Sequence, residues 1–110
     1  MTTILIRKTN KNEYQGFICM GHAGYAKRNQ PDILCAAISA LVTNTINSLE
    51  VIAEQKPNVI ANEETGFIRC DLTGCPNGKS ALLLDSMVLG LHMLSQDYGE
   101  QYLQVKFEEV

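Results

Sequence analysis

The sequence predicts an α+β fold, a two-layer sandwich with two helices packed on a mostly antiparallel sheet, in the order ββαββαβ. Three observations support this prediction. Two long segments that begin near Asp32 and Ser80 carry apolar residues at helical spacing. Short segments rich in β-forming residues precede, separate and follow them. The 110 residues, 45% of them hydrophobic, fit a single domain with one core over residues 1–110.

The N-terminal segment predicts a β-hairpin. Residues 3–7, TILIR, form the first apolar β-rich run, and residues 13–23, EYQGFICMGHA, form the second. Asparagine and lysine between them, at residues 9–13, suit the turn.

The first helix is predicted to begin at Asp32. Aspartate is a favoured N-cap, and Pro31 before it imposes an extended approach. The helix is expected to end at Pro57 and Asn58. Its apolar face recurs in steps of three or four residues and comprises Leu34, Ile38, Leu41, Thr45, Leu49 and Ile52.

The second half of the chain predicts a hairpin, a helix and a strand. Residues 58–72 form a hairpin that turns at residues 64–66. Residues 80–98 are apolar on most sides and predict a buried helix, with Gly99 as its C-cap. Residues 101–109 alternate and predict the last strand.

Charge and hydropathy argue against several classes of protein. The net charge is −3, and the nine basic residues are scattered, which argues against an electrostatic nucleic-acid binder. No continuous apolar run reaches the roughly eighteen residues of a membrane span, and the N-terminus lacks a signal-peptide pattern. We therefore expect a cytoplasmic protein with four reduced cysteines and no membrane partner. No motif for a cofactor or a metal dominates the sequence.

Cys35 is the first candidate for chemistry. With Asp32 as N-cap, it lies in the first helical turn, where free amides and the helix dipole stabilise a thiolate. Amides near Cys35 and Ala36 are candidates for holding the oxyanion of a tetrahedral intermediate. Ser39, four residues on, shares that side of the helix.

His22 is the second candidate. It is expected at the end of the second strand, between Gly21 and Gly24, from where a loop can fold back towards Cys35. A cysteine beside a histidine supplies a nucleophile and a general base. The alternative is structural: Cys35 as a small buried helix residue, and His22 as a surface residue at a strand end.

Two further alternatives belong to other classes. Cys19, His22, Cys70 and Cys75 could form a small zinc-stabilised domain. Against this, residues three apart on a strand point to opposite faces. The other alternative is a non-catalytic binding module on the same fold. Bound zinc would identify the former, and unchanged biological activity of Cys35→Ala the latter.

The segments GHAGYA, DILCAAISAL and NTINSLE together resemble the ribosomal-processing cysteine protease family Prp. That family carries a Gly-His-Ala motif, a loop, and an Asp-hydrophobic-hydrophobic-Cys-Ala-Ala-hydrophobic-Ser segment, and the resemblance covers essentially the whole chain. It implies that His22 is the catalytic histidine and Cys35 the nucleophile. Asp32 and Ser39 match the family's aspartate and serine and are possible supporting residues, with Ala36 beside them.

The resemblance also implies an activity: removal of the N-terminal extension of a large-subunit ribosomal protein through an acyl-enzyme. It implies a homodimer as well. The loop with Gly24, Tyr25, Lys27 and Arg28 is a possible substrate contact. Pro31 stands where family members usually carry glycine.

Overall fold

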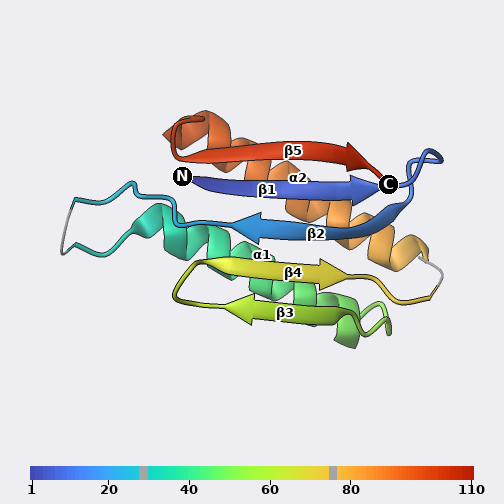
Figure 1. The fold of residues 1–110 in the computed structure, drawn as a ribbon. Helices are drawn as coiled ribbons and strands as arrows, with labels where there is room; N and C mark the ends of the chain where they lie inside the picture. Colours follow the sequence, from blue (N-terminus) through green and yellow to red (C-terminus); the bar gives the residue numbers. More distant parts are fainter. Residues whose placement is uncertain (28–29, 75–76) are drawn as a thin grey trace.

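The computed structural model describes residues 1–27, 30–74 and 77–110. Its element order is ββαββαβ, so the predicted fold class is confirmed (Figure 1). Arg28 and Cys75, both named in the sequence predictions, lie outside the described residues. The elements are β1 (Thr2–Lys8), β2 (Tyr14–Met20), α1 (Ile33–Val51), β3 (Asn58–Asn62), β4 (Phe67–Asp71), α2 (Gly78–Tyr98) and β5 (Leu103–Glu109).

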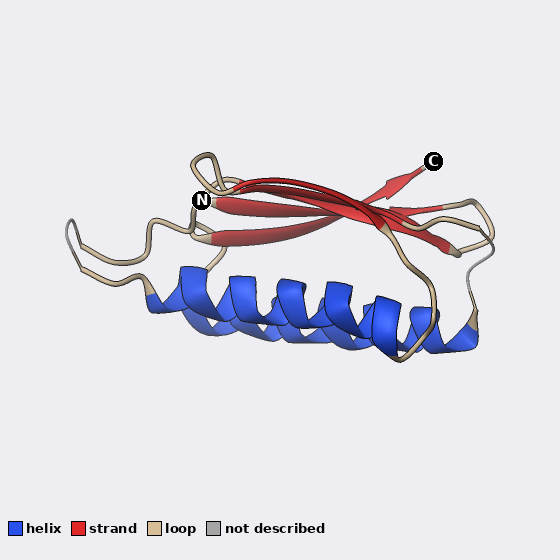
Figure 2. Cartoon of the chain, turned by 90° about the horizontal axis from the view of Figure 1, so that it is seen from below, coloured by secondary structure: helices blue, strands red, loops and turns tan. Residues whose placement is uncertain are grey.

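The five strands form one mixed sheet in the order β3-β4-β2-β1-β5. Three neighbouring pairs are antiparallel, and β1 pairs with β5 in parallel. Both helices cover the same face of the sheet, which leaves the other face open (Figure 2). The helices α1 and α2 pack side by side in this layer, so that each contributes to a core between helices and sheet.

The core is formed where alternate strand residues meet the apolar helix faces. Ile4 and Ile6 of β1, Phe17 of β2 and Cys70 of β4 are almost completely buried. From α1 the buried residues are Leu34, Ile38, Val42, Thr45 and Leu49, and from α2 they are Ser80, Leu84, Met87, Val88, Leu91 and Ser95. Burial alternates along β1 and recurs every three or four residues along both helices, so each of these elements turns one face to the core.

Two predicted boundaries are wrong, and the first of them changes the position of a site residue. The strand expected over residues 13–23 ends at Met20, because Gly21 adopts φ +84° and takes the chain out of the sheet. His22 therefore lies in a loop beyond the strand. The helix expected to run to Pro57 ends at Val51, and Ile52, expected on its apolar face, is its exposed C-cap.

Helix α1 is long and apolar enough, by length and composition alone, to cross a membrane, with a mean hydropathy of 1.3 over its best window. One such helix is weak evidence, because the core helix of a globular domain passes the same test. Five residues of α1 are buried, and the helix packs against α2. Its outer face also carries polar Asn44, Asn47 and Glu50. The helix is therefore packed in the domain along one face.

Candidate active site

Asp32 organises the start of α1 and the loop before it. It is the N-cap, as predicted, and its Oδ1 accepts a hydrogen bond from the Cys35 amide at 2.9 Å. Its Oδ2 accepts from the amides of Tyr25 at 2.8 Å and Ala26 at 3.3 Å. Partial burial acts to raise the pKa of Asp32, but bonds from the Cys35, Ala26, Tyr25 and Leu34 amides outweigh it, so the pKa lies below its usual value. The carboxylate therefore ties the loop to the helix.

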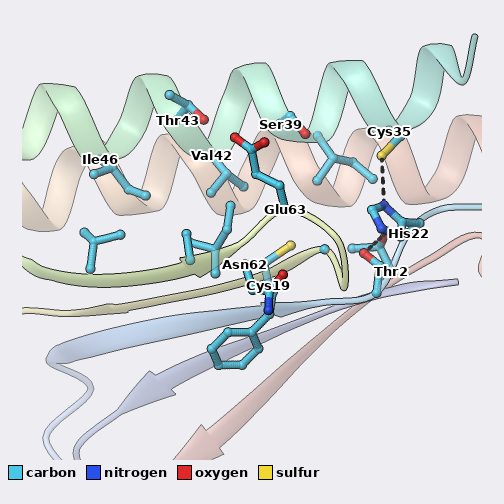
Figure 3. A pocket seen from close by; sticks show the side chains of 17 residues that line it. Thr2, Cys19, His22, Cys35, Ser39, Val42, Thr43, Ile46, Asn62 and Glu63 are labelled. Carbon is cyan, nitrogen blue, oxygen red and sulfur yellow. Dashed lines mark hydrogen bonds between the residues drawn. The ribbon is translucent and has the colours of Figure 1, made fainter.

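His22 and Cys35 lie next to each other. The Cys35 Sγ is 3.9 Å from the His22 Nδ1, although thirteen residues separate them in the sequence (Figure 3). The other ring nitrogen, Nε2, is 3.0 Å from the backbone carbonyl oxygen of Glu64. A carbonyl oxygen only accepts hydrogen bonds, so this contact places a proton on Nε2. In the neutral ring, Nδ1 then carries the lone pair and faces the thiol.

The Glu64 carbonyl is the part of this site that the sequence did not predict. It belongs to the turn between β3 and β4, far from both motifs. Gly66 allows the turn to come close, because a Cβ at this position would lie 2.6 Å from the Gly21 carbonyl oxygen and 3.2 Å from the His22 Cε1. Gly66 also has φ +67°, which favours glycine. A glycine in this turn was visible in the sequence, but its contact with His22 was not.

The base of the His22 loop is held by the first residues of the chain. The buried Thr2 donates a hydrogen bond from Oγ1 to the Gly21 carbonyl oxygen at 3.2 Å. A Cβ at Gly21 would lie 2.6 Å from the Met1 carbonyl oxygen. His22 is therefore fixed on two sides, by β1 below and by the β3–β4 turn beside it.

The amides expected to form an oxyanion site are already engaged. The Cys35 amide donates to the Asp32 side chain, and the Ala36 amide donates to the Asp32 carbonyl oxygen at 3.0 Å. The expectation that these two donors stand free is therefore wrong for this structure. Ser39 is exposed on the same side of α1, and no hydrogen bond joins its hydroxyl to another described residue.

A pocket of about 440 Å³ extends from Cys35 and His22 between α1 and the β3–β4 hairpin. Its lining is mostly apolar, and Cys19 of β2 lies on its floor (Figure 3). Burial, and secondarily the nearby Cys35, raises the pKa of the Cys19 thiol to about 11. The residues that α1 contributes are Cys35, Ile38, Ser39, Val42, Thr43 and Ile46, and those of the hairpin include Val59, Ala61, Asn62, Glu63, Gly66, Phe67 and Ile68.

The loop residues predicted to touch substrate have different surroundings. The Tyr25 ring packs edge-on against Tyr98 and Tyr102, with centroid separations of 5.0 and 5.1 Å, so it anchors the loop to the end of α2 and to the residue just before β5. Gly24 has φ +67° and is exposed, as is Lys27. Substrate contact by this loop stays a prediction.

The remaining described cysteine, Cys70, lies in the core. Burial, and secondarily Asp71, raises the pKa of its thiol to about 12. Among residues 1–27, 30–74 and 77–110, no three or more His, Cys, Asp or Glu side chains come together as a metal site. The zinc alternative also named Cys75, which lies outside these ranges.

Replacing Asp32 tests its role at the start of α1. Asp32→Ala loses the side-chain bonds to the Cys35, Tyr25 and Ala26 amides and should lower the free energy of unfolding by about 1 to 2 kcal/mol at pH 7. Asp32→Asn keeps the cap to Cys35 through its one oxygen, but its NH2 group accepts neither loop amide. Its loss of stability should therefore be smaller than that of Asp32→Ala. Urea unfolding measures both, with Asp97→Asn on the exposed end of α2 as the control.

The stability difference between wild type and Asp32→Ala should depend on pH, because the carboxylate stabilises the fold only when it is ionised. The folded state lowers the pKa of Asp32, so its stabilisation is present above the unfolded pKa of about 3.9 and is lost as pH falls through the folded value. The difference between wild type and Asp32→Ala should therefore shrink towards pH 2. A difference that stayed constant with pH would contradict the role given to the carboxylate.

An α+β sandwich that places a cysteine beside a histidine, at the rim of an apolar pocket, has the arrangement of a cysteine protease. The family model described as cysteine protease Prp matches residues 1–103. The chain belongs to the Prp family of cysteine proteases.

Curated relatives and solved structures agree with this assignment. The ribosomal processing cysteine protease Prp of Bacillus subtilis (strain 168) is 28% identical over 104 residues, covering 91% of this chain and 92% of the relative. Prp of Staphylococcus aureus (strain Mu50 / ATCC 700699) is 23% identical over 100 residues, covering 91% and 93%.

The fold is similar to that of solved Prp structures. S. aureus Prp in complex with a covalently linked product peptide matches with a TM-score of 0.89 and 20% identity, covering 98% of this chain and 100% of that one. The same protease with a substrate peptide gives a TM-score of 0.86 at 19% identity, with the same coverage. At these identities the likeness establishes the fold.

Proposed function

We propose that this cysteine protease removes the N-terminal extension of a large-subunit ribosomal protein, using Cys35 as nucleophile and His22 as general base. The observation that carries the Cys–His assignment is the position of the His22 ring between the Cys35 Sγ and the Glu64 carbonyl. The substrate is supported by the Prp resemblance and by the relatives' name, ribosomal processing protease. Such a substrate places the reaction in the cytoplasm.

Acylation begins with the transfer of the Cys35 thiol proton to the His22 Nδ1. The resulting imidazolium keeps its Nε2 hydrogen bond to Glu64, which holds the ring in place. The thiolate then attacks the scissile carbonyl carbon and forms a C–S bond. As the C–N bond breaks, His22 returns the proton to the leaving amine. The N-terminal part of the substrate remains as a thioester on Cys35.

Deacylation reverses the proton movements. His22 takes a proton from water, the hydroxide adds to the thioester carbonyl, and the C–S bond breaks. The Cys35 sulfur recovers its proton from His22. The products are the free N-terminal segment and the shortened ribosomal protein.

The oxyanion needs a donor near Cys35. Since the Cys35 and Ala36 amides are occupied by Asp32, we assign this role to the Ser39 hydroxyl. Ser39 lies one helical turn from Cys35, on the pocket side of α1, and residues four apart on a helix are neighbours. The apolar pocket beyond it suits the apolar side chains of a peptide.

The proposed homodimer is supported by an apolar stripe on the outer side of α2. Leu82, Leu89 and Met93 are 70%, 63% and 55% exposed and follow helical spacing along one face. Ile33, at the start of the neighbouring α1, is 58% exposed. Exposed apolar side chains along one helix face are typical of protein–protein contacts.

The test is incubation of the purified protein with the unprocessed ribosomal protein, followed by intact-mass measurement. We expect one N-terminal segment to be released by a single cut. Intact substrate after prolonged incubation with folded wild-type protein would contradict the proposal and favour the non-catalytic binding module.

A further inference from the structure

We propose that an extended segment of the substrate binds as an additional strand on the free edge of β3, in the groove that leads away from Cys35. This rests on the proposed function, because the occupant is the peptide that Cys35 cleaves. The groove is the part of the pocket described above that lies between α1 and β3, and we call it the α1–β3 groove. Three features of the described residues support this: the edge itself, its continuity with Cys35, and its length.

The two outer strands of the sheet differ in how their edges are protected. The outer strands are β3 and β5, and an outer strand offers unpaired backbone groups to any passing chain. Natural proteins protect such edges with charges or proline. Strand β5 carries Lys106, Glu108 and Glu109. Strand β3, with the sequence NVIAN, carries neither a charge nor a proline, and all five of its residues are exposed.

The unprotected edge is continuous with Cys35. Val59 and Ala61 of β3 line the same pocket as Cys35. Beyond its last residue, β3 leads into the turn whose Glu64 carbonyl contacts His22. A peptide strand laid along β3 therefore runs beside the pocket that contains the Cys35 thiol and the His22 ring.

The dimensions of the groove match a short strand. On α1 it runs from Cys35 to Ile46, and eleven residues of helix at about 1.5 Å each span roughly 16 Å. An extended peptide covers that distance with about five residues at roughly 3.3 Å each. Strand β3 is itself five residues long.

This binding mode defines the chemistry of the ligand. Main-chain hydrogen bonds to β3 give affinity that does not depend on sequence, and alternate side chains give specificity. Every second side chain of the peptide points into a groove lined by Ile38, Val42 and Ile46, so those positions favour apolar residues. The intervening side chains point away from it.

Amide hydrogen exchange on the Cys35→Ala variant tests the proposal. The probe is a synthetic peptide that spans the N-terminal extension and cleavage site of the ribosomal protein. At ten times its Kd, alternate amides in Asn58–Asn62 should exchange about tenfold more slowly, because only those facing the edge gain a partner. The amides of β5 serve as the matched control and should not change.

A second set of peptides tests the same contact from the ligand side. Single N-methyl groups placed along the peptide should lower wild-type kcat/KM with a period of two residues, since alternate peptide amides donate to β3. A peptide that is cleaved by wild type and bound by Cys35→Ala, while β3 exchange is unchanged, overturns this inference and leaves the proposed function standing.

Two other outcomes of these experiments would overturn the β3 proposal. A peptide that is neither cleaved nor bound removes the proposed function, and this inference with it. Protection of β3 amides in the free protein that grows with protein concentration would assign the edge to a second copy of the chain, which overturns the peptide proposal.

Discussion

Cys35→Ala is expected to abolish cleavage of the unprocessed ribosomal protein, with a loss of more than about a thousandfold in turnover. Alanine offers no nucleophile, and a half-buried helix position tolerates it, so the fold should persist. His22→Ala should lower turnover nearly as much, because the Cys35 thiol then loses the base 3.9 Å away. Intact-mass time courses measure both losses.

The double variant and a matched control sharpen this prediction. Cys35 and His22 act as a unit in the proposed mechanism, so removing both should cost little more than removing Cys35 alone. Cys19→Ala removes another thiol from the same pocket and should keep activity within about tenfold of wild type. Substantial turnover by folded Cys35→Ala would show that another group is the nucleophile.

Gly66→Ala should have the second-largest effect on activity, although residue 66 lies far from either motif in the sequence. A Cβ there would stand 2.6 Å from the Gly21 carbonyl oxygen, which is backbone and cannot rotate away, and 3.2 Å from the His22 ring. The β3–β4 turn must therefore shift and move the Glu64 carbonyl away from the ring. A misplacement of about 1 Å can cost roughly a hundredfold in rate, and we expect a loss of this order in kcat/KM.

Gly74→Ala is the control for backbone strain. Gly74 has φ +75°, close to the +67° of Gly66, but nothing lies within 4 Å of a Cβ there. Both variants should lose about 1 to 2 kcal/mol of stability from the left-handed conformation. Only Gly66→Ala should lose activity at temperatures where both are folded. Equal activity of the two would show that the turn does not position His22.

The fold could be predicted because it depends on local pattern. Helical spacing after Asp32 and β-forming runs at the strands determine the order of elements, and the Asp32 cap follows from residue type and position. The juxtaposition of His22 and Cys35 was also within reach, because a glycine-flanked loop joins them.

What the sequence did not predict involves the main chain. The Glu64 contact uses a carbonyl, which every residue carries, so residue 64 has no sequence signal. The amides of Cys35 and Ala36 were expected to be free, yet one cap residue engages both. The early end of β2 depends on the conformation of Gly21, and glycine alone does not specify which conformation it adopts.

The central claim is that His22 activates Cys35, and alkylation against pH tests it most directly. Iodoacetamide labelling of the native protein, mapped by peptide mass, should modify Cys35 first, because the His22 Nδ1 lies 3.9 Å from its sulfur and can accept the thiol proton. Cys19 and Cys70, whose pKa values are raised to about 11 and about 12, should stay unlabelled until the protein is denatured. His22→Ala should slow the labelling of Cys35, because the thiol then lacks a neighbouring base. If Cys35 labels no faster than the buried thiols, and removing His22 leaves its labelling unchanged, the two residues are neighbours without a shared proton and the account is wrong.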